Sequence, residues 1–314
     1  MWHVSPDLIE RLRDVGERLS QRYRRRDDRD KIRQKVTTTY GDIRRLSPFS
    51  SSALAEWTQG RPLVAVDGSV NSTGGTPPHT VVLFQALAKS SHGAQHWAAD
   101  VRTPLLEEGD LWAKDEGRWR SRVLAKLELA VARKAVEAER PRAVLMDGSL
   151  FHYHLDAPDE WAALKAAVLE QDVLLIGVSE EIGTTDVARA CVEGSAHGRT
   201  DREVLYGVLE PGECFWVDNL GRKQGFRTVF ARTSRHPQCI GIDLLIEQRQ
   251  EAADAVRLVM ALTPPEGRGI PLWLDIVDRD VRITDKLVEA LVDQYLDPAV
   301  KRLVLSPKRR ERPY

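Results

Sequence analysis

The stretches LVAVDGS (63–69) and VLMDGSL (144–150) decide how this sequence folds. Each opens with a short, wholly apolar run, which is typical of a strand buried on both faces of a sheet. A strong helix is expected between them over residues 118–140, and a helical crossover makes the two strands parallel neighbours. Asp67 and Asp147 then lie where the strands end, at the sheet edge where α/β proteins collect their sites. The alternative for each motif is a plain Asp-Gly turn.

The remaining pattern completes an α/β order of elements. Further strands are expected over residues 80–88, 94–101, 173–178, 225–232, 239–245 and 272–274. Further helices are expected over residues 7–46 (as one or two helices), 159–170, 204–209, 247–262 and 284–295, with a loop over 47–52 and a Gly- and Pro-rich turn over 71–78.

The composition is that of a soluble globular protein, with 314 residues of which 42% are hydrophobic and 30% charged. A chain of this length can bury a sizeable core. No apolar run approaches the roughly 20 residues that cross a bilayer, and the charged start lacks a signal-peptide pattern. We therefore expect a cytoplasmic protein that does not enter a membrane. Cys191, Cys214 and Cys239 are too widely spaced for a zinc ribbon or a CxxC redox pair.

Charge is unevenly distributed although the net charge is only −1. Residues 1–48 hold 13 Lys and Arg against 8 Asp and Glu, and the end of the chain carries Lys308, Arg309, Arg310 and Arg312. Such runs could contact phosphates. They could equally be ordinary solvated surface, and the sequence leaves both interpretations open.

A third carboxylate, Glu128, lies within an apolar stripe of the helix expected over 118–140. Leu124, Val131 and Ala135 recur at helical spacing on the same side. A carboxylate on a core-facing stripe is costly without a hydrogen-bond partner, a cation or a metal. A buried ion pair is one explanation. The other is that Glu128 points into the same cleft as Asp67 and Asp147.

Three carboxylates at one strand end suit Mn²⁺ or Mg²⁺, which are hard cations that take oxygen ligands. Two such ions about 4 Å apart activate a water and stabilise the leaving oxygen in phosphodiester hydrolysis. The sequence has no GxxxxGK[ST], no GxSxG and no HExxH, so other common hydrolase motifs are missing. His152 and His154 follow the second motif and are interpreted as packing or phosphate-contacting residues.

On these residues the chain resembles the NurA nuclease family. The resemblance spans roughly residues 60–300 and rests on AVDGS, the Glu-bearing helix and VLMDGSL. Three further segments look like family segments: LLIGVSE (174–180), TDREVLYGVLEPGE (200–213) and IPLWLDIVDRDVRITDK (270–286).

The resemblance implies a ribonuclease H-like mixed sheet flanked by helices, with a C-terminal α/β elaboration. Residues 1–50 would form an N-terminal helical arm, 51–300 the nuclease domain and 301–314 a basic tail. It implies a deoxyribonuclease that depends on Mn²⁺ or Mg²⁺, acts on single-stranded DNA and 5′ ends, and serves in DNA end resection and repair. Its partners would be DNA, a second copy of the chain, and a HerA-like hexameric ATPase that supplies the energy for translocation.

Three positions depart from the family pattern. Glu180 stands where the family usually has Lys, and Phe230 where it has Tyr. Asp275 matches the position of a late His and becomes the fourth catalytic candidate after Asp67, Glu128 and Asp147. Two alternatives therefore stay open: a weakened or non-catalytic DNA-binding protein that keeps the fold, or another ribonuclease H-like nuclease or resolvase.

Overall fold

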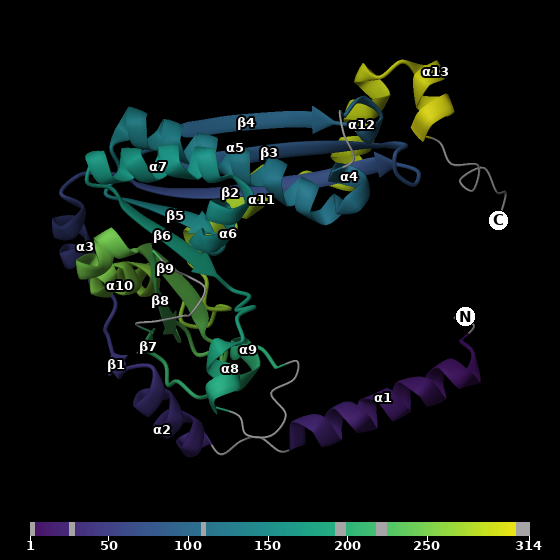
Figure 1. Cartoon of the computed structure of the whole chain (residues 1–314). Coiled ribbons are helices and arrows are strands. Elements are labelled where there is room, and N and C mark those ends of the chain that lie inside the picture. The colour runs from purple at the N-terminus through teal and green to yellow at the C-terminus, as the bar shows by residue number, and fades with distance from the viewer. Residues whose placement is uncertain (1–3, 25–28, 108–110, 192–198, 218–224, 306–314) are drawn as a thin grey trace.

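The computed structural model describes residues 4–24, 29–107, 111–191, 199–217 and 225–305. Its centre is a mixed sheet in the order β1-β7-β8-β9-β6-β5-β2-β3-β4 (Figure 1). The strands are β1 (Ile43–Arg45), β2 (Leu63–Gly74), β3 (Thr80–Ser90), β4 (Gln95–Arg102), β5 (Ala143–Asp147), β6 (Leu174–Ser179), β7 (Glu213–Val217), β8 (Phe226–Ala231) and β9 (Ile240–Leu245).

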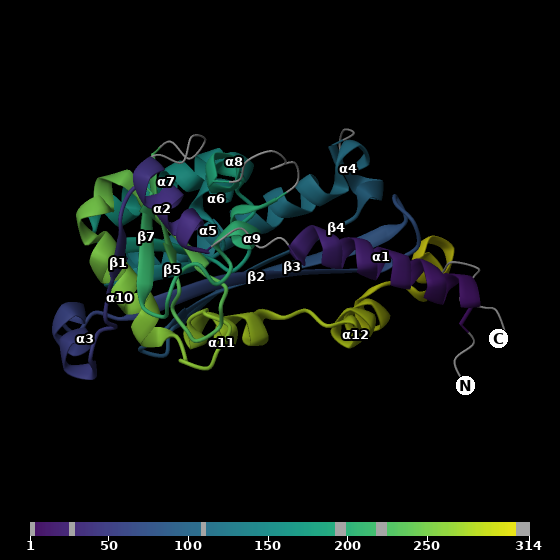
Figure 2. The ribbon, with the colours of Figure 1, turned by 90° about the horizontal axis from the view of Figure 1, so that it is seen from below.

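Helices cover both faces of this sheet, with α5 and α7 on one side and α11 and α12 on the other (Figure 2). The helices are α1 (Pro6–Arg24), α2 (Arg29–Thr39), α3 (Ser51–Thr58), α4 (Leu111–Lys114), α5 (Glu116–Glu139), α6 (Leu150–Asp156), α7 (Pro158–Glu170), α8 (Asp186–Cys191), α9 (Asp201–Leu205), α10 (Ala252–Leu262), α11 (Leu272–Val281), α12 (Asp285–Tyr295) and α13 (Pro298–Val300). The expected α/β class is confirmed.

The central strands are buried on both faces, which explains their unbroken apolar sequence. In β5, Ala143 and Leu145 belong to the core beneath α10 and α11. The alternate residues Val144 and Met146 belong to the core beneath α5 and α7. Successive side chains of a strand point to opposite faces, so a strand between two helical layers must be apolar at every position.

The pairing of β2 with β5 fixes where the sheet opens. The two strands are parallel, as expected, with Leu63–Val66 opposite Ala143–Met146. Beyond this point β5 ends at Asp147, whereas β2 continues to Gly74 paired only with β3. Asp67 is therefore the first residue of β2 past its parallel partner.

Four expectations about secondary structure are wrong. The helical region expected over 7–46 ends before strand β1, and the helix expected over 204–209 is the end of α9 followed by a turn. The turn expected over 71–78 begins later, because β2 keeps its antiparallel pairing with β3 up to Gly74. The strand expected over 272–274 is instead the first turn of α11. Leu274, Val277 and Val281 recur at helical spacing and are all buried in the core beneath the sheet. This helical spacing extends beyond the short apolar run PLWL, and the segment therefore forms a helix and not a strand.

The two N-terminal helices lie in different surroundings. On α1, Leu8, Ile9, Leu12, Val15 and Leu19 are 43–69% exposed, and the helix stands apart from the sheet (Figure 1). On α2, Ile32 and Val36 are buried in a core shared with β7 and β8.

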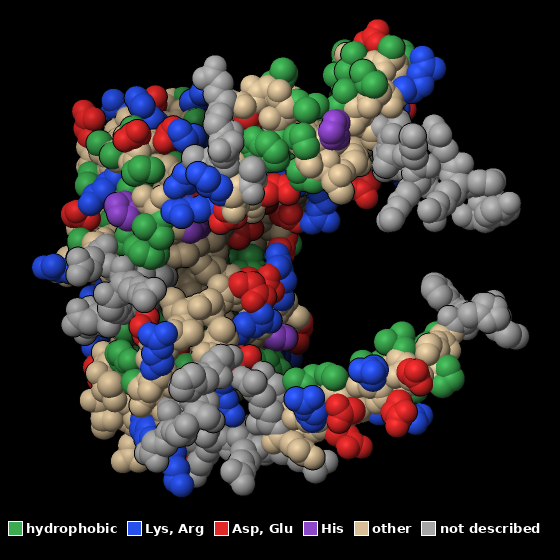
Figure 3. Space-filling view, turned by 45° about the vertical axis from the view of Figure 1, so that its right-hand side comes forward, with side chains coloured by type: hydrophobic (Ala, Val, Ile, Leu, Met, Phe, Trp, Pro, Cys, Tyr) green, Lys and Arg blue, Asp and Glu red, His purple; other side chains and the backbone are tan. Residues whose placement is uncertain are grey.

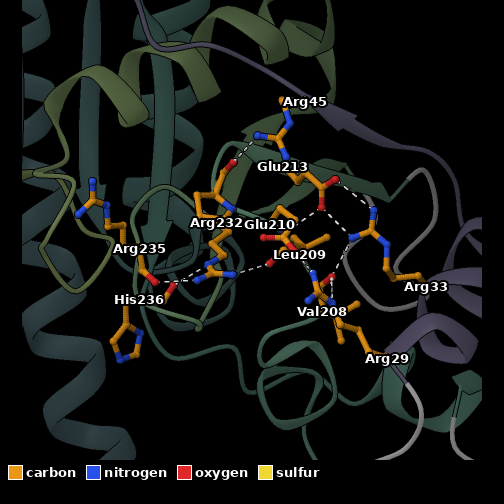
Figure 4. A network of polar contacts seen from close by, with 11 residues as sticks. Arg29, Arg33, Arg45, Val208, Leu209, Glu210, Glu213, Arg232, Arg235 and His236 are labelled. Atoms are coloured by element: carbon orange, nitrogen blue, oxygen red, sulfur yellow. Dashed lines mark hydrogen bonds and ion pairs between the residues drawn. The ribbon is translucent and has the colours of Figure 1, made fainter.

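Polar contacts add to the anchoring of α2 (Figure 4). Arg33 donates to the carbonyl oxygen of Val208 at 2.8 Å and to the Glu213 carboxylate at 2.7 and 3.1 Å. Arg29 pairs with Glu210. The charged segment around α2 is thus held at one end of the sheet. No helix among the described residues has the length and apolar character to cross a membrane.

Gly177 of β6 allows the turn after Asp147 to cross the sheet. A Cβ there would lie 2.7 Å from the Gly148 carbonyl oxygen and 2.9 Å from the Leu150 amide nitrogen. Both are backbone atoms, which cannot move aside as a flexible side chain can.

Gly177→Ala should therefore lower the free energy of unfolding by about 1–3 kcal/mol through overpacking. The control is Gly183→Ala, where an added Cβ meets no atom within 4 Å, and the change should stay within about 0.5 kcal/mol. Urea unfolding of both variants measures the difference. Equal stability of the two would contradict the close crossing.

Candidate active site

Asp67 begins the site from the middle of β2. Its side chain is 8% exposed and accepts a hydrogen bond of 2.7 Å from the Gly68 amide. Ser69 and Asn71, further along β2, bind the backbone of Ile283, just after α11. The polar half of β2 thus carries the first carboxylate and holds the end of α11.

Gly68 makes room for Glu128, which descends from α5 onto β2. A Cβ at Gly68 would lie 2.5 Å from Glu128 Oε1 and 2.7 Å from Leu124 Cδ1. Glu128 is 5% exposed, so its expected place on the buried stripe is confirmed. The glycine of the first motif is therefore a point of close approach within a strand and does not form a turn.

The second motif is a turn, and it leads into α6. Gly148 has φ +116°, a value that favours glycine, and its amide donates to the Val178 carbonyl oxygen at 2.8 Å. Ser149 caps α6 and donates through Oγ to Asp243 Oδ2 at 2.5 Å. Asp147 is thereby fixed at the end of β5.

Tyr153 of α6 joins the three carboxylates, and the sequence reasoning missed it because α6 was not expected. Its hydroxyl donates to the Asp147 carbonyl oxygen at 3.1 Å and is also hydrogen-bonded to the Glu128 carboxyl group. The hydroxyl has one proton to donate. The contact opposes the rise in the pKa of Glu128 and raises the pKa of Tyr153, so the phenol is the donor toward the Glu128 carboxylate and shares its one proton between that group and the Asp147 carbonyl oxygen.

The electrostatics show that the carboxyl groups act on one another. Burial, and next to it the charge of Asp147, raise the pKa of Asp67 from 3.8 to about 7. Burial, followed by the charge of Asp67, raises the pKa of Glu128 well above its ordinary value. Burial also raises the pKa of Asp147 to about 6. The cluster is short of positive charge.

Helix α11 brings a further carboxylate, Asp278, which the sequence reasoning missed because it expected a strand over 272–274 and no helix after it. Asp278 raises the pKa of both Asp67 and Asp147, so its charge faces both groups. It pairs with Arg282, which lowers the pKa of Asp67.

Asp275 lies one turn earlier and accepts a 2.6 Å hydrogen bond from Arg268. The same guanidinium pairs with Glu180 and opposes the rise in the pKa of Asp147. Acidic and basic side chains alternate along the recess between the upper and lower parts of the protein (Figure 3).

Phe230, which stands where the family usually has Tyr, offers no hydroxyl to the site. Phe230 is 1% exposed and its ring stacks on Phe215 with centroids 6.1 Å apart. The His152 ring lies 3.9 Å from the Tyr153 ring, and His154 faces Phe226 at 6.2 Å. The phenol near the carboxylates therefore comes from Tyr153.

The donor chemistry suits a hard divalent cation, because carboxylate oxygens are its preferred ligands and the buried charge needs compensation. Within the described residues, however, no three His, Cys, Asp or Glu side chains are already spaced around a common metal position. One candidate ligand, Glu128, is instead hydrogen-bonded to Tyr153.

Comparison with known proteins fits this geometry. The NurA domain family matches residues 61–283, which include Asp67, Glu128 and Asp147. The chain belongs to the NurA family. The predicted enzyme class, a nuclease that hydrolyses phosphodiester bonds, is thereby confirmed. In sequence, no curated protein matches the chain.

The structure is similar to the NurA nuclease from Sulfolobus solfataricus, with a TM-score of 0.62 and 14% identity over 93% of this chain and 96% of that one. This likeness confirms the ribonuclease H-like fold expected for the NurA family. The catalytic domain of human Endonuclease V is 14% identical over 80% of this chain and 93% of that one, with a TM-score of 0.39.

The raised pKa of Asp67 predicts how stability depends on pH when no metal is bound. The folded protein keeps a proton on Asp67 up to about pH 7, whereas the unfolded chain releases it near pH 3.8. The contribution to stability is complete below the lower value and is lost as the pH rises to the upper one. Wild-type protein should therefore lose on the order of 2–4 kcal/mol more than Asp67→Asn over this interval.

Thermal or urea unfolding in a chelator, at several pH values, measures this loss. Asp159→Asn, at an exposed position on α7, is the control and should follow the wild type. An unchanged pH profile in Asp67→Asn would show that the pKa of Asp67 is not raised in the folded protein.

Proposed function

We propose that this chain is a cytoplasmic, metal-dependent deoxyribonuclease in which Asp67, Glu128 and Asp147 hold Mn²⁺ or Mg²⁺. The observation that carries the proposal is the gathering of three carboxyl groups where β5 ends. Burial raises all three pKa values, the charge of Asp147 adds to the rise at Asp67 and Glu128, and that of Asp278 to the rise at Asp147. A carboxylate cluster that is short of positive charge is the electrostatic counterpart of a cation site. The bound ion would activate a water and stabilise the leaving oxygen.

The side chains of the protein have separate roles in this proposal. Asp67 and Asp147 are held by backbone contacts on adjacent strands and set the position of the scissile phosphate. Tyr153 orients Glu128 through its hydroxyl. Arg268 and Arg282 balance the carboxylates of α11 and offer guanidinium groups to the phosphate backbone.

We further propose the substrate and partners that the family resemblance implies: single-stranded DNA and 5′ ends, a second copy of the chain, and a HerA-like hexameric ATPase, in end resection and repair. The exposed apolar stripe of α1 supports the dimer, since none of the described residues of the chain buries these side chains. The basic tail lies outside the described residues apart from 301–305.

Replacement of Asp67 or Asp147 by Asn should reduce the rate of Mn²⁺-dependent cleavage of single-stranded DNA by about 100-fold or more. The reason is the loss of an anionic ligand, and of the charge stabilisation that depends on it, in the transition state. Cleavage of a labelled oligonucleotide measures the rate, with Asp159→Asn as the control and circular dichroism to check folding. Full activity in either folded variant would sink the assignment.

The two acidic residues of α11 separate into different roles. Asp278→Ala should weaken Mn²⁺ binding by about 10- to 100-fold, because the charge of Asp278 faces Asp67 and Asp147. Asp275→Ala should weaken it less, because Asp275 is occupied by Arg268. Calorimetric titration of both variants compares them. A larger loss in Asp275→Ala would make Asp275 the fourth ligand, as the sequence suggests.

A further inference from the structure

A cavity of about 220 Å³ begins two residues beyond Asp147, at Ser149, and the proposed cleavage reaction does not involve it. Its walls come from the start of α6, the end of β6 and strands β8 and β9. Asp147 pairs with Val178 across β5 and β6. The cavity is lined by residues that closely follow each of these partners, Ser149 and Ser179. The cavity therefore lies at the carboxyl ends of β5 and β6, the same end of these strands as Asp147.

A glycine creates the cavity. In the antiparallel pair of β8 and β9, Phe230 faces Gly241. A Cβ at Gly241 would lie 3.6 Å from Ser179 Cβ and 3.8 Å from Ile182 Cγ1. The missing side chain leaves Phe230 and Ile182 as apolar walls, and both are otherwise buried. A larger residue at 241 would occupy this space.

Five of the lining residues are polar. Ser149 and Thr184 donate their hydroxyl protons to Asp243 and Asp201, and Glu181 pairs with Arg202. Ser179 and His152 remain. The hydroxyl of Ser179 is buried and has no hydrogen-bond partner among the described residues. His152 also lines the cavity, and burial lowers the pKa of its imidazole, which keeps the ring neutral. A buried hydroxyl without a partner is costly, so a ligand that bonds to it would gain free energy.

We propose that this cavity receives one unstacked nucleobase of the DNA strand whose phosphate lies at Asp67 and Asp147, with Ser179 as the hydrogen-bonding contact. The proposal rests on the proposed nuclease function. The volume is smaller than the roughly 300–1,000 Å³ of sites for drug-sized ligands, which suits a single planar ring system.

The chemistry of the walls favours the base over the other parts of a nucleotide. The only charged side chain among the lining residues is that of Glu181, which pairs with Arg202 and would repel a phosphate. A base is uncharged, has apolar faces and carries hydrogen-bonding groups at its edge. Pockets that take a base out of the stack combine these same two features.

The test is equilibrium binding of single-stranded oligonucleotides in which one abasic tetrahydrofuran unit is moved position by position. Binding is measured by fluorescence anisotropy without added metal, in an Asp67→Asn background that prevents cleavage. At one register, loss of the base should weaken binding by about tenfold, the size of one base–aromatic contact. Gly241→Leu should erase that register dependence, because the leucine side chain fills the cavity.

Ser179→Ala provides a second variant that does not depend on the fold accepting a leucine. It should lower the register effect while raising stability, since it removes a buried hydroxyl without a partner. Thr80→Val is the matched control, because Thr80 also has a buried hydroxyl without a partner but does not line the cavity. It should raise stability and leave the register effect unchanged.

Equal affinity for every abasic position in folded protein would overturn the base pocket. If the wild type nevertheless cleaves DNA, the proposed function stands without the pocket. If binding depends on the abasic position but the wild type cleaves no DNA, the cavity binds a base and the proposed nuclease function is wrong. If the affinity of Ser179→Ala and Gly241→Leu depends on the abasic position as the wild type's does, the base binds at another surface.

Discussion

The chemistry of the site depends on the repulsion between carboxylates that two parallel strands bring together. Because β5 stops at Asp147 while β2 runs on, Asp67 and Asp147 face the same opening between the helical layers. Water that would screen their charges is largely excluded there, so each raises the cost of ionising its neighbours. The fold stabilises this arrangement through its two large apolar cores, while the carboxylates themselves oppose it. A site in tension with its own fold is a frequent feature of enzymes.

The local sequence around each carboxylate follows from this constraint. Gly68 allows the Glu128 side chain to reach β2, and Gly148 allows the chain to turn into α6, which carries Tyr153. The two Asp-Gly-Ser motifs look alike but use their glycines differently. Arg268 supplies a cation close to Asp147 from the segment before α11, and it pairs with Glu180, where the family usually has Lys. A positive charge is thus present at the site although the residue that would normally provide it is replaced.

Sequence reasoning predicted the parallel pair, the long helix and the burial of Glu128, because each is encoded by a local apolar period. It could not find Tyr153, whose place depends on the short helix α6, nor Asp278, whose place depends on reading α11 as a helix. The single aspartate after PLWL attracted attention because a strand end was expected there. The true period, Leu274, Val277 and Val281, extends past it and turns Asp278 toward the site. The pairing of Arg268 with Glu180 joins residues that are far apart in the sequence, so no local pattern could predict it.

We expect the carboxyl groups of Asp67 and Glu128 to be protonated near pH 6 without a cation and ionised with one. Calorimetric titration of Mn²⁺ near pH 6, in two buffers of different protonation enthalpy, measures the protons released on binding. The pKa values of about 7 for Asp67 and about 6 for Asp147, together with the raised pKa of Glu128, predict release of at least about one proton for each protein molecule. Mn²⁺ binding of equal enthalpy in both buffers, with no proton released, would contradict the account.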